Sequence, residues 1–187
     1  LVIPGEKDNR AFAANPNQIG QQVVINTLEA GDVVKFGKQD WIVLDPAKGM
    51  IIKKTFLFKN WSFGDSRTSN FYNTSNGLGR TLNEYYFGQL AALNDTEKAQ
   101  VQNVQWNIGP RTNEASRKVS SKVGLLTASE WEKYSKHFNP DTGLLSTEDF
   151  SGMWTLTTST NNTTIGAGYY SKVDASVGQD PSDSRFY

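Results

Sequence analysis

The sequence contains no cysteine, which excludes disulfide bonds, thiolate metal sites, iron–sulfur clusters and cysteine nucleophiles. It contains one histidine, His137, at the C-terminal end of an expected helix. There the helix dipole and solvent favour an imidazolium with a structural role. A serine triad is not expected, because the chain has neither a G-x-S-x-G turn nor a second histidine. No P-loop or complete G-x-G-x-x-G is present, so nucleotide binding has no support.

The chain also lacks a net charge and a long apolar run. Its 19 Lys+Arg balance its 19 Asp+Glu, so no overall field draws it to nucleic acid or to an anionic membrane. No stretch approaches the roughly 18 apolar residues of a membrane span, and no basic start precedes an apolar segment. We therefore expect no nucleic-acid partner and no membrane insertion.

What the chain does contain is enough apolar material for one core. Of its 187 residues, 37% are hydrophobic and 12% aromatic, which suits one globular domain. Residues 1–20 show no sustained periodicity and are expected to be an arm or linker, with a single domain over 21–187. Because the chain begins with Leu1 rather than Met, we expect it to be part of a larger multidomain protein.

Hydrophobic patterning predicts an α+β fold of short antiparallel strands with two or three helices. Alternation and turn residues predict strands at 32–36, 41–44, 50–58, 123–126, 153–157 and 169–177. A helix is expected over 79–93, followed by a second short helix capped by Asn94, with Val101 and Val104 on its apolar side. A capping box, Thr127 to Glu130, predicts a third helix with Trp131, Tyr134 and Phe138 on its apolar side. Residues 107–121 and 159–168 are expected to be loops.

Acidic residues suggest two kinds of chemistry. Glu130, Glu132, Glu148 and Asp149 could serve a glycosidase, although Glu130 is already explained by the capping box. Late aspartates, Asp174, Asp180 and Asp183, offer oxygen ligands for calcium, but their spacing fits no EF-hand. A solvated acidic turn is the simpler interpretation, so we expect no catalytic residues, no metal site and no cofactor, with calcium as the alternative.

Aromatic residues in polar surroundings are the more suggestive set. Asn, Ser and Thr together supply 48 of the 187 residues, a composition typical of loop-rich binding modules. A ring beside amides and hydroxyls can stack on a sugar face while its neighbours bind the sugar hydroxyls. Trp41, Trp131 and Trp154 are expected in the core, whereas the pattern leaves core and ligand contact open for Trp61 and Trp106. The candidate ligand-binding residues are Trp61, Phe63, Trp106, Arg111, Asn161, Asn162, Tyr169 and Tyr170.

Several motifs occur in a characteristic order. Phe36-Gly37 precedes Trp41-Ile-Val-Leu44, Leu82-Asn83 lies in a helix, Val123-Gly-Leu-Leu-Thr-Ala-Ser-Glu130 follows, and Trp154-Thr-Leu156 comes last. This order resembles a bacterial and phage surface module of unknown function, similar in layout to the C-type-lectin-like fold, which includes formylglycine-generating enzymes. Those enzymes use cysteines for copper, so the resemblance implies the scaffold only. The chain departs from the lectin calcium signature at Gln179-Asp-Pro181 and from the family pattern at Thr157, and its closing strand is shortened.

These observations predict a non-catalytic recognition or adhesion module that binds a glycan or a cell-surface protein through loop aromatics. The resemblance implies an extracellular, bacterial cell-surface or phage-particle location. Two alternatives stay open: a small carbohydrate-active hydrolase that uses two of the acidic residues, and a structural spacer domain without a ligand.

Overall fold

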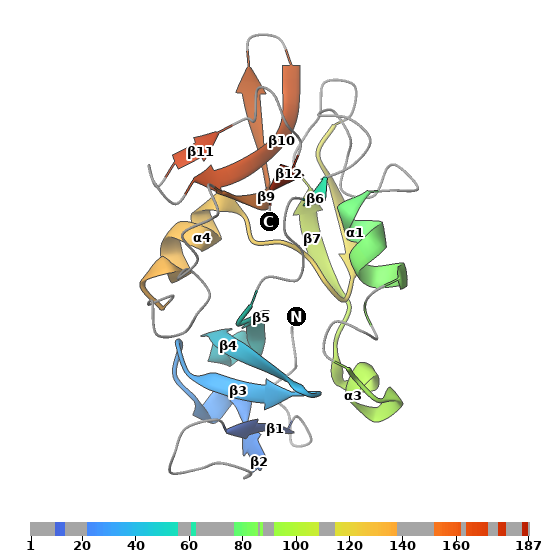
Figure 1. Ribbon diagram of the computed structural model, residues 1–187, viewed down its shortest axis with the longest axis vertical. Coiled ribbons are helices and arrows are strands. Elements are labelled where there is room, and N and C mark those ends of the chain that lie inside the picture. The colour runs from blue at the N-terminus through green and yellow to red at the C-terminus, as the bar shows by residue number, and fades with distance from the viewer. Residues whose placement is uncertain are drawn as a thin grey trace.

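The computed structural model describes residues 10–13, 22–55, 61–62, 77–85, 87, 92–108, 115–137, 152–161, 164–171, 176–178 and 185–186 (Figure 1). Its strands are short and pair antiparallel, and a few short helices join them, so the predicted α+β class is confirmed. A five-stranded sheet lies at one end of the molecule and a three-stranded sheet at the other, with α4 and a two-stranded ribbon between them (Figure 1).

The five-stranded sheet has the order β2-β1-β3-β4-β5. Its strands are β1 (Arg10–Ala13), β2 (Gln22–Val24), β3 (Val33–Phe36), β4 (Gln39–Asp45) and β5 (Met50–Lys53), with the 3-10 turn η1 (Ile25–Thr27) between β2 and β3. β3, β4 and β5 form the predicted meander, although the third strand ends at Lys53 and residues 56–60 lie outside the described residues. β1 falls within the segment expected to be an arm, yet it pairs with both β2 and β3. At least these four residues belong to the sheet.

β4 is the central strand of the core. Its residues Trp41–Leu44 are all buried, so both faces of the strand are covered. Such a strand is expected to read as a continuous apolar run rather than as an alternation. The Trp41 indole N–H donates to the Phe36 carbonyl at 3.1 Å, which satisfies its polar group inside the core.

The turn after β4 forms for local reasons. Asp45 caps the short helix η2 (Pro46–Lys48) by accepting from the Lys48 backbone N–H. Pro46 has a fixed φ that suits a first helical position. Gly49 ends the turn with φ 65°, a left-handed conformation that costs glycine little. This turn separates the strands expected at 41–44 and 50–58.

The expected helix at 79–93 begins as α1 (Leu78–Arg80) and continues as η3 (Thr81–Tyr85), which has π-helical hydrogen bonding. Its later part falls largely outside the described residues. Its buried side is formed by Leu78, Thr81 and Leu82. The short helix α3 (Asp95–Gln100) follows.

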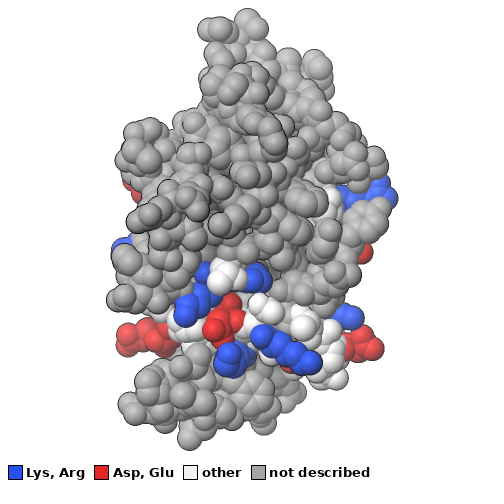
Figure 2. Space-filling view, viewed as in Figure 1, with Lys and Arg blue, Asp and Glu red and all other residues white. Residues whose placement is uncertain are grey.

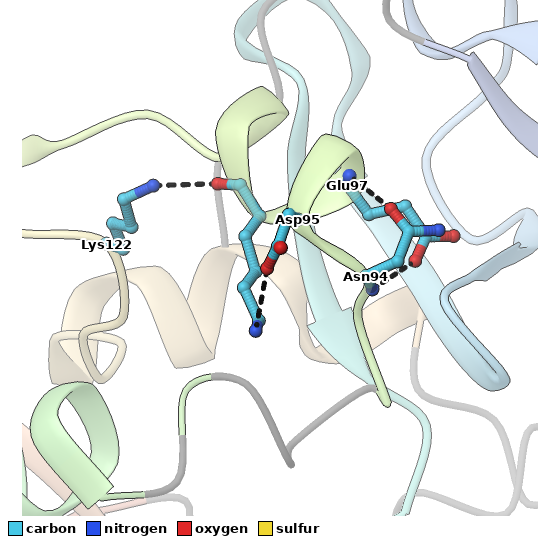
Figure 3. Close-up of polar contacts among 5 residues, drawn as sticks. Asn94, Asp95, Glu97 and Lys122 are labelled. Atoms are coloured by element: carbon cyan, nitrogen blue, oxygen red, sulfur yellow. Dashed lines mark hydrogen bonds and ion pairs between the residues drawn. The ribbon is translucent and has the colours of Figure 1, made fainter.

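α3 begins with a complete capping box (Figure 3). The Glu97 N–H donates to Asn94 Oδ1 at 2.9 Å, and the Asn94 N–H donates to Glu97 Oε2 at 2.8 Å. Lys122 donates from Nζ to the Lys98 carbonyl at 2.7 Å, which satisfies a carbonyl near the C-terminal end of the helix (Figure 3). The expected Asn94 cap is confirmed, but the helix stops before Val101.

A two-stranded ribbon replaces the loop expected at 107–121. β7 (Val104–Ile108) pairs antiparallel with β8 (Arg117–Ser121). Val104 therefore lies in a strand, not on the apolar side of a helix. Trp106 and Ile108 are buried, whereas Gln105 and Asn107 between them are exposed. This alternation gives the ribbon one packed face and one solvent face.

The 121–126 segment leaves the ribbon and is not the strand expected at 123–126. Its backbone bonds instead to the side chain of Asn83, which lies 40 positions earlier. The Val123 N–H donates to Asn83 Oδ1 at 2.8 Å, and Asn83 Nδ2 donates to the Val123 carbonyl at 2.8 Å. An amide side chain thus takes the place of a neighbouring strand, because it offers the same donor and acceptor pair as a peptide group.

The predicted third helix is confirmed as α4 (Ala128–Tyr134), extended by the turn η4 (Ser135–His137). The Glu130 N–H donates to Thr127 Oγ1 at 3.2 Å and the Thr127 N–H donates to Glu130 Oε2 at 2.8 Å, so the expected capping box is present. Trp131 and Tyr134 are buried, as predicted. Phe138 lies outside the described residues.

The C-terminal sheet has the order β11-β10-β9, with β9 (Gly152–Asn161), β10 (Thr164–Ser171) and β11 (Ser176–Gly178). The loop expected at 159–168 is wrong, because most of these residues extend the β9–β10 hairpin. β6 (Trp61–Ser62) pairs antiparallel with β12 (Arg185–Phe186).

Candidate binding site

Five of the eight predicted binding residues lie in strands that the structure describes. Trp61 lies in β6, Asn161 ends β9, and Tyr169 and Tyr170 lie in β10. Trp106 lies in β7. The other three candidates, Phe63, Arg111 and Asn162, fall outside the described residues. The expected loop context is therefore wrong for Trp61, Trp106 and Asn161. Tyr169 and Tyr170 lie in a strand, as expected for 169–177, and ligand contacts stay a prediction.

Trp106 is enclosed by other parts of the protein. Its side chain is only 8% exposed, and its indole N–H donates to the Ser121 carbonyl at 2.9 Å. The ring lies directly over Gly124, where an added Cβ would approach it to 2.4 Å. A ring enclosed in this way has no free face for a ligand, so Trp106 is withdrawn from the candidate set.

The structure brings several of the remaining aromatic residues to one region. β12 pairs with β6 and also contacts β9, which pairs with β10 (Figure 1). In the register, Trp61 lies opposite Phe186 and Tyr169 lies opposite Trp154. We call this group the aromatic strand cluster; its members are Trp61, Trp154, Tyr169, Tyr170 and Phe186. Its four strands lie side by side, and β6 is distant in sequence from the other three.

Charges of both signs lie close together among the described residues. Figure 2 shows basic and acidic residues intermingled in the lower middle of the view. Ion pairs join Lys35 to Asp40 at 2.8 Å and Arg80 to Glu84 at 2.6 Å, both within one local stretch of chain. Exposed pairs of this kind contribute about 0–1 kcal/mol each.

A buried polar contact links α4 to the end of β4. Tyr134 is 4% exposed and donates from its hydroxyl to Asp45 Oδ2 at 3.4 Å. Burial alone would raise the pKa of the Asp45 carboxyl, but the hydrogen bonds and positive charge of Lys48 outweigh it and lower the pKa below its ordinary value. Asp45 is thus held ionised as a helix cap and as an acceptor for Tyr134.

The described acidic residues that were considered for hydrolysis or metal binding do not form a catalytic or metal-binding group. Glu130 Oε2 accepts from the Thr127 backbone N–H and from its hydroxyl at 2.9 Å, which is a capping role. Glu148, Asp149, Asp174, Asp180 and Asp183 lie outside the described residues. Within the described ranges, no group of three or more His, Asp or Glu side chains could hold a metal ion.

His137 differs from its expected solvated state. A Cβ placed on Gly31 would lie 3.4 Å from His137 Nδ1, so the imidazole packs against this backbone. Burial and, second, the positive charge of Lys136 lower the pKa of His137 below 6.5. The imidazolium is therefore disfavoured, contrary to the expectation from the helix dipole.

We expect this histidine to make stability depend on pH near neutrality. As the pH falls below about 6.5, the unfolded chain takes up the proton first, so the folded state loses stability until its own lower pKa is passed. Melting temperatures from about pH 8 to about pH 5 should fall more steeply in the wild type than in His137→Gln. Equal slopes in the two proteins would contradict this assignment, because carboxylate titration is common to both.

One polar surface was missed by the sequence analysis. Gln105 and Asn107 of β7 and Lys118 and Ser120 of β8 are exposed, and they lie on the solvent side of the ribbon. We call these four residues the ribbon outer face. The alternation of polar and apolar residues over 104–108 is the signal that could have revealed it. Mixed charge and Gly109-Pro110 instead led to a loop assignment.

Comparisons with protein-family models, curated proteins and solved structures give no significant match for this chain. Within the described residues, none of the helices combines the length and apolar character needed to cross a bilayer. Function therefore has to be argued from the site itself.

Proposed function

We propose that this chain is a non-catalytic recognition module of a bacterial surface or phage protein, which binds a glycan or a protein receptor. The observation that carries the proposal is the aromatic strand cluster. Tryptophan and tyrosine supply large, rigid contact areas together with a polar group, and such residues dominate many recognition surfaces. In this chain, four strands that meet in space each contribute at least one aromatic residue.

We also propose that the scaffold has a C-type-lectin-like layout. The surface module that the sequence resembles has a similar layout. Two of the ordered motifs contact each other directly, since Asn83 of the Leu-Asn motif bonds to Val123 of the V-x-L-L motif. This contact gives a physical reason for the motifs to occur together. It supports the resemblance without extending it to a ligand.

Binding is expected to depend on the aromatic strand cluster. The full chain would be titrated against a glycan array and a panel of bacterial and host surface proteins. Tyr169→Ala and Trp61→Ala should each weaken the best ligand by at least about tenfold, because truncating a central aromatic residue typically costs about 2 kcal/mol or more. Lys38→Ala, at an exposed turn of the other sheet, is the control and should bind as the wild type does.

Unchanged affinity in both aromatic variants would show that the site lies elsewhere. If no glycan or surface protein bound at all, the recognition function itself would be wrong and a spacer role would be favoured. Cleavage of a glycan that is lost in Glu148→Gln or Asp149→Asn would favour a hydrolase, since removal of a general acid costs about 100-fold or more.

A further inference from the structure

β1 lies between two strands that follow each other in the sequence. β2 and β3 are joined by residues 25–32, yet the sheet order β2-β1-β3-β4-β5 places β1 between them (Figure 1). β1 pairs antiparallel with both neighbours, since Ala11 lies opposite Val23 of β2 and Phe12 lies opposite Lys35 of β3. β2 and β3 therefore form the two sides of a slot that is one strand wide, and β1 fills it.

The part of the sheet beyond this slot is held together by its own residues. β3 pairs with β4 along its whole length, and Val34 lies opposite Trp41. Both side chains are buried, and the Trp41 indole N–H donates to the Phe36 carbonyl at 3.1 Å. Because these contacts do not involve β1, its removal would leave β3, β4 and β5 paired and would open one edge of β3. An open edge accepts another strand through its free N–H and C=O groups.

β1 itself shows what the slot accepts. The main contacts of β1 are with β2 and β3, so strand pairing holds it on both sides. The same segment of a second copy would make the same contacts, because strand pairing does not depend on which chain supplies the strand. The choice between the two sources depends on the connection between β1 and β2.

This connection is formed by the eight residues 14–21. A short connection gives β1 an effective concentration of about 1 mM at its own slot. When extended, a segment of this length spans up to about 26–29 Å, which is enough to carry β1 to the slot of an adjacent copy. A second copy therefore competes for the slot when the protein reaches about 1 mM, or when copies are held side by side.

We propose that β1 is an exchangeable strand: the slot between β2 and β3 takes up β1 from a second copy of this chain. Two such insertions close a symmetric dimer, since each copy gives one strand and receives one. The inference is independent of the proposed recognition function and goes beyond it. In a module that binds a ligand, the dimer presents two aromatic strand clusters, which increases the avidity for a repeating ligand.

Cysteine pairs test the exchange directly, because the full chain contains no cysteine of its own. Ala11 and Val23 are opposite in the register, and such residues have Cα atoms about 4.5–5.5 Å apart, which allows a disulfide. Ala11→Cys chains and Val23→Cys chains with different affinity tags would be mixed at about 1 mM and oxidised. They should form at least about fivefold more mixed disulfide dimer than Ala11→Cys with Lys38→Cys, at the exposed β3–β4 turn.

A chain with both Ala11→Cys and Val23→Cys provides a second measurement. Its internal disulfide locks β1 in its own slot, so the oxidised double variant should stay monomeric. The wild type and the reduced double variant should become dimeric as the concentration rises from about 0.05 to about 2 mM. Small-angle X-ray scattering would measure the mass at each concentration.

Each outcome decides the proposal. Equal crosslinking of the two cysteine pairs, or a wild type that is still monomeric at about 2 mM, would overturn it. A dimer that persists in the locked variant would also overturn it, because the copies would then associate through another surface. These measurements contain no ligand, so their failure would leave the recognition function standing.

Discussion

Replacement of Asn83 by leucine is expected to destabilise the fold by about 2–4 kcal/mol. The Asn83 carboxamide bonds to both polar groups of the Val123 backbone and, from Nδ2, to the Gly79 carbonyl at 2.8 Å. Leucine fills a similar volume but removes the acceptor of the Val123 N–H and the Nδ2 donor to the Val123 carbonyl, which keeps the Ser121 hydroxyl as a donor at 3.0 Å. Each unsatisfied group costs about 1–3 kcal/mol. Urea denaturation should show the loss as a lower transition midpoint.

Two further variants make the prediction specific to the amide. Asn83→Asp retains an acceptor for the Val123 N–H but places a carboxylate oxygen against two carbonyl oxygens, so it should also destabilise the fold. Asn103→Leu is the matched control, because Asn103 is exposed and should change stability by no more than about 0.5 kcal/mol. A loss of less than about 1 kcal/mol in Asn83→Leu would show that water replaces the amide at Val123.

The elements predicted well are those determined by neighbouring residues. The expected Asn94 cap and the expected Thr127–Glu130 capping box both depend on groups three positions apart, and both are present. The β3–β4–β5 meander follows from short apolar segments, among them the continuous run Trp41–Leu44, and from the Asp45–Gly49 turn. In each case the interacting groups are close in sequence, so a pattern can reveal them.

The elements predicted poorly depend on distant partners. β8 has a polar sequence and becomes a strand because it pairs with β7. The part of the β9–β10 hairpin nearest its turn is rich in Thr, Ser and Gly, and its residues form strands because they pair with each other. The 123–126 run has the apolar character of a strand, but its backbone pairs with Asn83 instead. Composition shows none of these pairings.

The same reason limits prediction of the site. Trp61 and Tyr169 could be chosen from the sequence as aromatic residues in polar surroundings, but their closeness in space depends on β6 pairing with β12. Trp106 has a polar context in the sequence, yet it faces inward because β7 alternates between a packed and a solvent side. The residues that flank it in β7, Gln105 and Asn107, face outward for the same reason.

Gly124→Ala is expected to destabilise the fold by about 1–3 kcal/mol, because the new methyl group would overlap the ring of Trp106. A Cβ at this position would lie 2.4 Å from Trp106 Cδ2 and 2.6 Å from Cε2 and Cε3. The ring cannot easily withdraw, since its N–H bonds to the Ser121 carbonyl and its side chain is buried. Thermal and urea denaturation would measure the loss.

A double-mutant cycle with Trp106→Leu attributes this loss to the ring. Trp106→Leu alone should cost several kcal/mol, because it leaves a cavity and removes the donor to Ser121. In the double variant the smaller side chain makes room for the alanine methyl, so the combined loss should be smaller than the sum by about 0.5–3 kcal/mol. Additive losses would show that alanine at position 124 acts on the backbone of the 121–126 segment and not through contact with Trp106.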